Sequence, residues 1–354
     1  MTGTQTAADL IKHKLRTAAA ALGTADPQTY IGPLIDRSFP LPPGSSEYAA
    51  NALTPGAVPC EPSFSETEPR VLRFTIMPLD PRSSPASRRD EATREMRGLV
   101  GRLYGSDALH WFDHHSEEWR GTGSHSRLGF GAWFGTAYDE DGLQSAKVYY
   151  EMRPEQLEAL PVLLRALVHT AREAMPGLLP VFTTIRCGRH EGSQRVSFLH
   201  QGPLRLADLH PLMERLGLGH HLPSVMQVVG VSLGGRFDLP ARSVLLGLRE
   251  AGEGPELKLE VLLGMLPDLP PTFLDLLTLG LSERPRQLHA LGRWLRAFTP
   301  PSSDWPGDFS VLSVRTTPRT PARVSLYLRP VEFEVRRRLA DIPGLGASPA
   351  SAVA

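Results

Sequence analysis

The stretch GFGAWFGTAY (129–138), followed five residues later by QSAKVYYEM (144–152), decides the fold. Both runs are strand-like, and the short link between them contains the Asp-Gly pair that is typical of a hairpin turn. Similar pairs recur at a period of roughly 50 to 70 residues, which is the length of one supersecondary repeat. The other pairs are 60–66 with 71–79, 180–186 with 194–200, 241–249 with 255–263, and 309–316 with 322–330.

The links within the pairs are short, and the segments between successive pairs are long enough for one or two helices. Short links force the two strands of a pair to run antiparallel, whereas a parallel α/β barrel needs a helix after every strand. The repeating unit therefore reads as helix-helix-strand-strand. We predict an α+β fold, a ten-stranded antiparallel β-barrel surrounded by helices, whose interior is wide enough for a ligand.

Apolar residues at helical spacing predict the outer helices. The segment 7–22 forms a short amphipathic helix that ends at Gly23, whereas 27–59 is rich in Pro, Gly and Ser and has little periodic pattern. The segment 84–119 begins with Ser and Arg and becomes helical around Met96 and Leu103, and the other expected helical blocks are 155–174, 205–217 and 271–298. We expect one domain over 1–340, followed by a disordered tail over 341–354 that is rich in small residues.

Composition excludes several classes of function. The 354 residues carry 38 basic and 38 acidic side chains, so no global basic field attracts nucleic acid or a membrane surface. Cys60 and Cys187 are too few for a disulfide framework, which favours a cytoplasmic protein with ordinary strand cysteines. The sequence has no signal peptide and no apolar run of about 18 residues. No Ser-His-Asp pattern or G-x-S-x-G motif suggests a hydrolase.

Polar residues two positions apart recur on the strands and therefore share a face. If these faces look inward, the basic residues converge and require a multivalent anion such as diphosphate; if they look outward, the charges are simply solvated. The pairs are Glu61 and Ser63, Arg73 and Thr75, Lys147 and Tyr149, Arg195 and Ser197, Lys258 and Glu260, and Ser325 and Tyr327.

Three runs resemble a known family. CEPSFSETEPRVLRFTIMPLDP (60–81), AKVYYEM (146–152) and ARVSLYLRP (322–330), set in the helix-helix-strand-strand order, are similar to the ABBA aromatic prenyltransferases with their prenyltransferase barrel. In the dimethylallyltryptophan synthase branch, a Glu about a dozen residues before a strand Arg is the base on the acceptor side, and Glu61 before Arg73 matches it. Arg73, Lys147 and Tyr149 match positions that hold diphosphate.

The third and fourth hairpins depart from that branch. The third reads Arg195, Ser197, Leu199 where the branch has Arg-x-Lys-x-Tyr, and the fourth offers Lys258 and Glu260 where a neutral residue and a Tyr are usual. Such departures, and the Lys strand leading into a short helix, resemble the cyanobactin peptide prenyltransferases. The resemblance to that branch implies a ribosomal peptide as the acceptor and Mg²⁺ as a cofactor. The expected donor is dimethylallyl diphosphate, and geranyl diphosphate is the longer alternative. A free indole or phenol is the second option for the acceptor.

The chemistry of allylic diphosphates fits these residues. Ionisation leaves negative charge on the diphosphate, which Arg73, Lys147, Arg195 and Lys258 would bind, and positive charge on the allyl carbon. Aromatic rings would shield that cation, and Glu61 would take the proton from the acceptor. The expected shield is Tyr149 and Tyr327, with Trp133 or Tyr138 as further rings and core packing as their simpler role.

Other patterns point elsewhere. HWFDHHSEEW (110–119) suggests a metal site, but its spacing is not standard, and an exposed polar turn after a helix over 84–104 is the preferred interpretation. We expect His220 and His221 in a helix C-terminal turn and GVSLGGR (230–236) as a linker. The rivals to an enzyme are a catalytically inactive ligand-binding barrel and a repeat-built scaffold whose basic residues lie on the outer surface.

Overall fold

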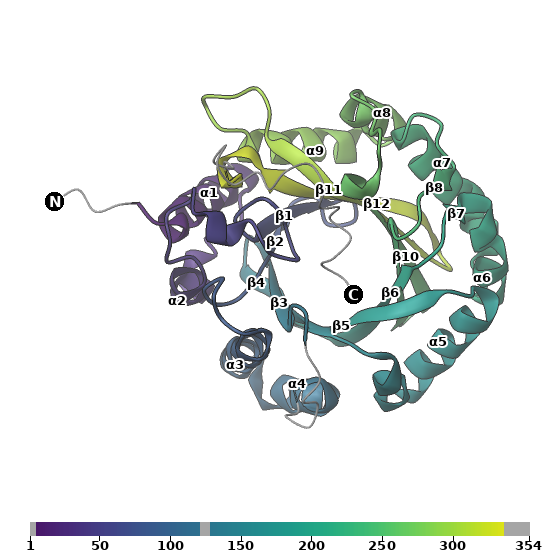
Figure 1. Cartoon of the computed structure of the whole chain (residues 1–354), viewed down its shortest axis with the longest axis horizontal. Coiled ribbons are helices and arrows are strands. Elements are labelled where there is room, and N and C mark those ends of the chain that lie inside the picture. Colours follow the sequence, from purple (N-terminus) through teal and green to yellow (C-terminus); the bar gives the residue numbers. More distant parts are fainter. Residues whose placement is uncertain (1–4, 121–127, 336–354) are drawn as a thin grey trace, which may run out of the picture.

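Ten strands form one closed antiparallel barrel in the computed structural model, which describes residues 5–120 and 128–335 (Figure 1). Around the barrel the order is β1-β12-β11-β10-β9-β6-β5-β4-β3-β2, and β1 closes the ring by pairing with both β2 and β12. The strands are β1 Cys60–Ser65, β2 Leu72–Ile76, β3 Ala132–Asp139, β4 Gly142–Glu151, β5 Leu178–Gly188, β6 Gly192–His200, β9 Val244–Ala251, β10 Gly254–Leu262, β11 Gly307–Thr317 and β12 Thr320–Pro330.

The helices lie outside the barrel (Figure 1). Thr6 and Asp9 form a capping box at the start of α1, and Gly23 ends it in the left-handed conformation. A separate two-stranded sheet, β7 Leu204–Arg205 with β8 Asp238–Leu239, lies between the third and fourth hairpins in the sequence. The α-helices are α1 Ala7–Leu22, α2 Gln28–Ser38, α3 Pro85–Leu103, α4 Gly105–Arg120, α5 Val162–Ala174, α6 His210–Arg215, α7 Leu222–Ser232, α8 Phe273–Gly280 and α9 Pro285–Phe298.

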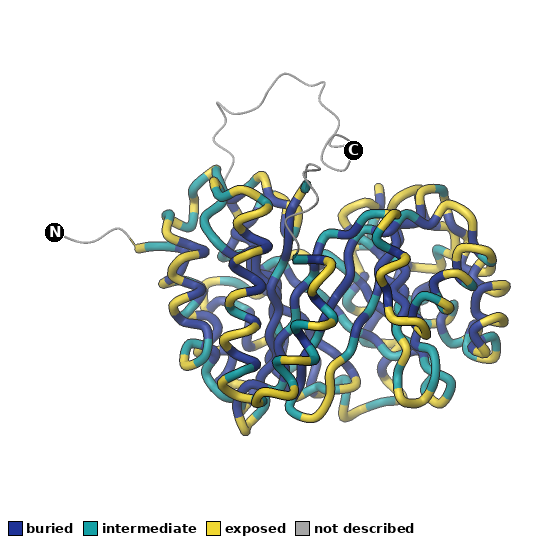
Figure 2. The backbone as a smooth tube through the Cα atoms, turned by 90° about the horizontal axis from the view of Figure 1, so that it is seen from below, coloured by how far each residue is buried: buried dark blue, intermediate teal, exposed yellow. Residues whose placement is uncertain are grey.

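The strands bury their apolar face outward, under the helices, and turn their polar face into the barrel. Along β12, Arg323, Ser325 and Tyr327 are partly exposed to the interior, whereas the intervening Val324 and Leu326 are buried in the core. Figure 2 shows the same separation, with buried stretches inside the molecule and exposed residues on the outer helices. The interior is therefore a solvent-accessible polar space, and the hydrophobic core is the shell between strands and helices.

The expected barrel and its five hairpins are confirmed. The repeat is less regular than predicted, because a short 3₁₀ helix, Pro154–Ala159, stands in the third repeat where the others have a further α-helix. Cys60 in β1 and Cys187 in β5 are buried free thiols, as expected for strand residues. The tail over 341–354 lies outside the described residues.

Several local expectations were wrong. The segment 27–59 contains α2, whose pattern is interrupted by Pro33 and by a non-helical residue at Ile31. HWFDHHSEEW is part of α4 rather than a turn, and 230–236 begins with the last residues of α7, which is too uniformly apolar to show a helical period. His220 and His221 lie in a 3₁₀ turn that leads into α7.

In the described ranges, 5–120 and 128–335, no helix combines the length and the apolar character needed to cross a lipid bilayer.

Two adjacent residues on β12 test whether the hydrophobic core lies outside the barrel wall and the polar face lies inside it. We expect Leu326→Ala, which removes a fully buried side chain from the shell, to lower the free energy of unfolding by about 2–5 kcal/mol. Ser325→Ala, on the cavity side, should change it by less than about 0.5 kcal/mol. Urea denaturation of both variants measures the difference, and equal losses would contradict a polar interior.

Candidate active site

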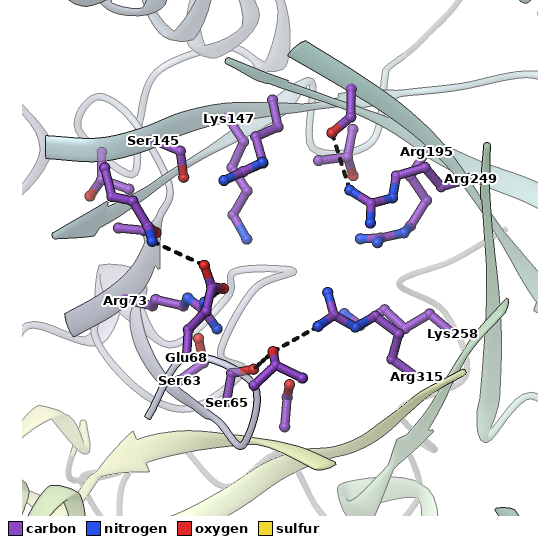
Figure 3. A pocket seen from close by; sticks show the side chains of 18 of the residues that line it. Ser63, Ser65, Glu68, Arg73, Ser145, Lys147, Arg195, Arg249, Lys258 and Arg315 are labelled. Carbon is purple, nitrogen blue, oxygen red and sulfur yellow. Dashed lines mark hydrogen bonds and ion pairs between the residues drawn. The ribbon is translucent and has the colours of Figure 1, made fainter. Parts of the chain in front are cut away.

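A cavity of about 300 Å³ lies inside the barrel and is strongly basic. Seven basic and two acidic side chains line it, together with several Ser and Thr hydroxyls. Figure 3 shows that the labelled basic side chains come from different sides of the barrel and point into one space. The basic residues are Arg73, Lys147, Arg186, Arg195, Arg249, Lys258 and Arg315.

The four cations predicted from the sequence all line this cavity: Arg73, Lys147, Arg195 and Lys258. The inward orientation of these strand faces is therefore confirmed. The alternative in which they point to solvent is wrong for these residues, as is the scaffold interpretation that required them on the outer surface. Their role toward diphosphate remains a prediction.

Lys147 is held in the cavity without a carboxylate partner. It forms no ion pair with any residue in the part of the chain that the structure describes, and its Nζ lies 4.9 Å from the centroid of the Tyr149 ring. Burial lowers the pKa of Lys147 well below its usual value, and the charges of Lys258 and Arg73 lower it further. An incoming anion would remove this penalty, so Lys147 is the cation best placed to gain from binding one.

Two glycines make room for the basic side chains. A Cβ on Gly135, which is the register partner of Lys147, would lie 2.6 Å from Lys147 Cε. A Cβ on Gly247 would lie 2.9 Å from Arg195 Cδ. Each long side chain therefore lies flat across the backbone of a neighbouring strand before its charged end reaches the cavity.

Carboxylates neutralise most of the remaining cations. Glu68 pairs with Arg73, Glu191 lies 3.4 Å from Arg186, and Glu260 Oε1 lies 2.5 Å from Lys258 Nζ. Lys258 Nζ also donates to Tyr327 Oη at 2.9 Å.

A separate carboxylate, Glu256, pairs with Arg195, Arg249 and Arg315. Burial on its own would raise the pKa of Glu256, but these three guanidinium charges lower it to about 2. The carboxylate is therefore ionised at every physiological pH.

Sequence reasoning missed Arg186, Arg249, Arg315, Glu68 and Glu256. It considered mainly the second strand of each pair, although Arg186, Arg249 and Arg315 lie on the first strand. Hairpin pairing would have found those three on the cavity face, because the residues two positions before them lie opposite Arg195, Lys258 and Ser325 in their hairpins. Glu256 shares its face with Lys258 by strand alternation. Glu68 lies in the loop after β1, where no alternation applies.

Glu61 lies on the same face of β1 as Ser63, two residues farther from the hairpin turn. Its side chain is 6% exposed and accepts a hydrogen bond of 2.6 Å from Ser310 Oγ. Burial raises the pKa of Glu61 to about 7. The hydrogen bond from Ser310 opposes this rise, and the negative charge of Glu260 adds to it. A carboxylate with this pKa can both accept and release a proton near neutrality.

Aromatic rings gather around Tyr149, beyond Lys147 on the same strand face. The Tyr149 ring centroid lies 6.1 Å from that of Trp133 and 5.6 Å from that of Phe182, and Phe130 stacks on Trp133 at 4.1 Å. Trp133 therefore joins the expected aromatic group.

Tyr138 does not join this group, which corrects one of the suggested shielding rings. Trp133 and Tyr138 are five positions apart on β3 and so lie on opposite faces, and the Tyr138 ring packs against Tyr30 and Phe74 in the outer shell. Tyr327, which lines the cavity beside Lys258, is correctly placed.

The residues do not fit a metal held by the protein. Over 5–120 and 128–335, no three His, Cys, Asp or Glu side chains are grouped so that they could hold an ion. In the segment 110–119, Asp113 pairs with Arg97 and Arg120, and His115 Nδ1 contacts the carbonyl oxygen of Trp111 at 2.8 Å. The Mg²⁺ that the resemblance implies therefore has no ligand cluster in the described residues.

Solved structures with similar folds include dimethylallyltryptophan synthases. The 5-dimethylallyltryptophan synthase of Streptomyces coelicolor is 19% identical, with 94% of this chain and 100% of that chain covered and a TM-score of 0.71. The chain has the prenyltransferase-barrel fold. The 6-dimethylallyltryptophan synthase of Micromonospora olivasterospora, solved with DMASPP and Trp, is 17% identical over 93% of this chain and 98% of that chain (TM-score 0.72).

AnaPT of Neosartorya fischeri has the same prenyltransferase-barrel fold at 13% identity, with 88% of each chain covered and a TM-score of 0.62. No protein-family model matches the sequence, and no curated protein matches it either. The fold expected from the sequence resemblance is thus confirmed, whereas the resemblance to the peptide-modifying branch remains a prediction.

The buried carboxyl of Glu61 should make stability depend on pH. Because its pKa is about 7 in the folded protein against an ordinary value of 4.5, the neutral form favours folding, and this advantage is lost as the pH rises from about 4.5 through 7. A pKa difference of that size corresponds to about 3 kcal/mol. We expect Glu61→Gln to be more stable than the wild type by up to this amount at pH 8, and equal to it near pH 4.

Urea denaturation at both pH values measures this effect. Glu250→Gln, which neutralises an exposed carboxylate on β9, serves as the control and should show no such change. A Glu61→Gln variant that is less stable than the wild type at pH 8 would contradict the raised pKa.

Proposed function

We propose that this protein transfers a dimethylallyl group from dimethylallyl diphosphate to an aromatic acceptor. The observation that carries the proposal is the position of Lys147 beside the ring of Tyr149. Lys147 is buried and pairs with no carboxylate among the described residues. Cations at one end and aromatic faces at the other are what the ionisation of an allylic diphosphate requires. Six further basic side chains surround the same cavity.

The charge of the cavity supports a diphosphate ligand. Its seven basic side chains face four paired carboxylates, Glu68, Glu191, Glu256 and Glu260, which leaves three positive charges once Lys147 is protonated. An ionised isoprenyl diphosphate carries about three negative charges, so binding brings the cavity close to neutrality.

The proposed reaction follows from this arrangement. The bond between the allylic carbon and its oxygen breaks, its electron pair goes to the diphosphate, and the basic side chains stabilise the new charge. The allyl cation is shielded by Tyr149 and Tyr327 until a carbon of the acceptor ring attacks it. The ring then loses a proton to the Glu61 carboxylate, which restores its aromaticity.

Tryptophan or another small aromatic compound is the first acceptor to test, because the Micromonospora structure with the same fold is a complex with DMASPP and Trp. A ribosomal peptide remains the acceptor that the sequence pattern favours. Geranyl diphosphate remains the longer donor, and a cytoplasmic location remains a prediction. A ligand-binding barrel without catalysis is the remaining alternative, which a turnover assay separates from the enzyme.

Mass spectrometry tests the proposal directly. Purified protein is incubated with dimethylallyl or geranyl diphosphate and with tryptophan, tyrosine, simple phenols, or linear and cyclic peptides that contain Trp or Tyr. We expect one acceptor to gain a single prenyl group, and we expect turnover to persist in EDTA because the basic side chains of the cavity can themselves neutralise the diphosphate. Failure to bind either donor, measured by calorimetry, would refute the proposal; donor binding without turnover on any acceptor would favour the non-catalytic barrel.

Lys147→Ala should remove turnover without harming the fold. Loss of a preorganised charge at the leaving group typically costs about 10² to 10³ in kcat. Because Lys147 is buried without a carboxylate partner in the described structure, its removal should leave the melting temperature unchanged or raised. Lys12→Ala, which breaks an ion pair with Asp36 on the outer helices, is the matched control and should keep full activity. Unchanged kcat and donor KM in Lys147→Ala would remove Lys147 from the diphosphate site.

A further inference from the structure

Three arginines converge on one carboxylate at the wall of the cavity. Arg195 of β6 is the register partner of Arg249 of β9, which lies opposite Glu256 of β10. Glu256 Oε2 lies 2.5 Å from Arg249 Nη2 and 3.7 Å from Arg315 Nη1, and its other oxygen accepts a hydrogen bond from Arg195. The carboxylate thus joins guanidinium groups from three strands.

The carboxylate lies behind the arginines rather than in the cavity. Glu256 is 1% exposed and does not line the cavity, whereas Arg195, Arg249 and Arg315 all line it. Figure 3 shows the arginine side chains reaching into the space that Arg73 and Lys147 face from other sides. The Nε atoms of Arg195 and Arg249 are buried and have no hydrogen-bond partner, so donors of this cluster remain unsatisfied.

Three guanidinium groups so close together repel one another unless an anion joins them. Each carries five N–H donors, and one carboxylate can satisfy only a few of them. A fixed anion behind the cluster therefore keeps the arginines together and leaves donors facing the cavity. An anion that arrives from the cavity side meets a prearranged set of donors and does not have to assemble it.

We propose that Glu256 is a positioning residue that organises Arg195, Arg249 and Arg315 into a subsite for the diphosphate group of the donor and for the diphosphate product. This inference rests on the proposed function, because it names the ligand of the same cavity. It adds Arg249 and Arg315 to the basic residues expected to contact diphosphate, and it gives Glu256 a role without contact to the substrate.

Glu256→Gln tests this role through binding rather than turnover. Without the fixed anion the arginines are uncompensated, so the melting temperature should fall by several degrees in a buffer free of multivalent anions. Inorganic diphosphate then meets arginines that are no longer held together and must assemble them itself, so it should bind about tenfold more weakly than to the wild type. Glu256→Asp, which keeps the charge, should behave like the wild type.

Glu66→Gln is the matched control. Glu66 is also 1% exposed and pairs with two arginines, Arg284 at 2.6 Å and Arg323 at 3.3 Å, but it does not line the cavity. This variant should lose stability but bind inorganic diphosphate as tightly as the wild type does. If Glu256→Gln binds diphosphate as tightly as Glu66→Gln does, or if Glu256→Gln loses no stability, the inference is overturned. If diphosphate does not bind the wild type, the proposed donor site itself fails.

Arg315→Met covers the case in which Glu256→Gln does not fold. Arg315 is the most distant of the three arginines from Glu256, so its loss leaves the other two pairs in place. We expect this variant to fold and to bind inorganic diphosphate about tenfold more weakly in calorimetry. An unchanged affinity would exclude Arg315 from the subsite and overturn the inference.

Discussion

The cost of placing seven basic side chains in one lumen is the constraint on which the rest of the structure depends. The fold meets it in two ways. Carboxylates neutralise the arginines and Lys258, and the alternation of the strands keeps the lumen accessible to solvent by turning most apolar side chains of the wall outward, under the helices. Lys147 lacks both a carboxylate partner among the described residues and full contact with solvent. Its positive charge is therefore available for a ligand.

The barrel and much of the site could be predicted from the sequence, because hairpin links and strand alternation are local signals. Alternation placed Arg73, Lys147, Arg195 and Lys258 on polar strand faces but left open whether those faces look inward, and the resemblance to the prenyltransferases implied that they do. The partners of these cations could not be predicted in this way. Arg195 and Arg249 are 54 residues apart in the sequence and meet only because β6 and β9 are neighbours in the closed barrel, an adjacency that no hairpin encodes.

Two kinds of local error have physical causes. Pro33 and the non-helical Ile31 interrupt the pattern of α2, and α7 is apolar on nearly every side, so neither helix shows a clean period. Tyr138 was considered for the lumen as an aromatic residue on the same strand as Trp133, but the two are five positions apart, so strand alternation places them on opposite faces. The structure places it in the outer shell, where it packs against Tyr30 and Phe74.

The lumen also has a direction, which follows from the order of residues along single strands. On β4, Ser145 and Lys147 precede Tyr149, and on β1, Ser65 and Ser63 precede Glu61 when both strands are followed away from their hairpin turns. The arginines belong to the hairpin side, and the aromatic rings and the carboxyl with raised pKa lie beyond them. A diphosphate attracted to the arginines would therefore point its allylic carbon toward Tyr149 and Glu61. An acceptor ring would have to reach that carbon from the opposite end of the barrel, so the two substrates would meet where the cations end and the base begins.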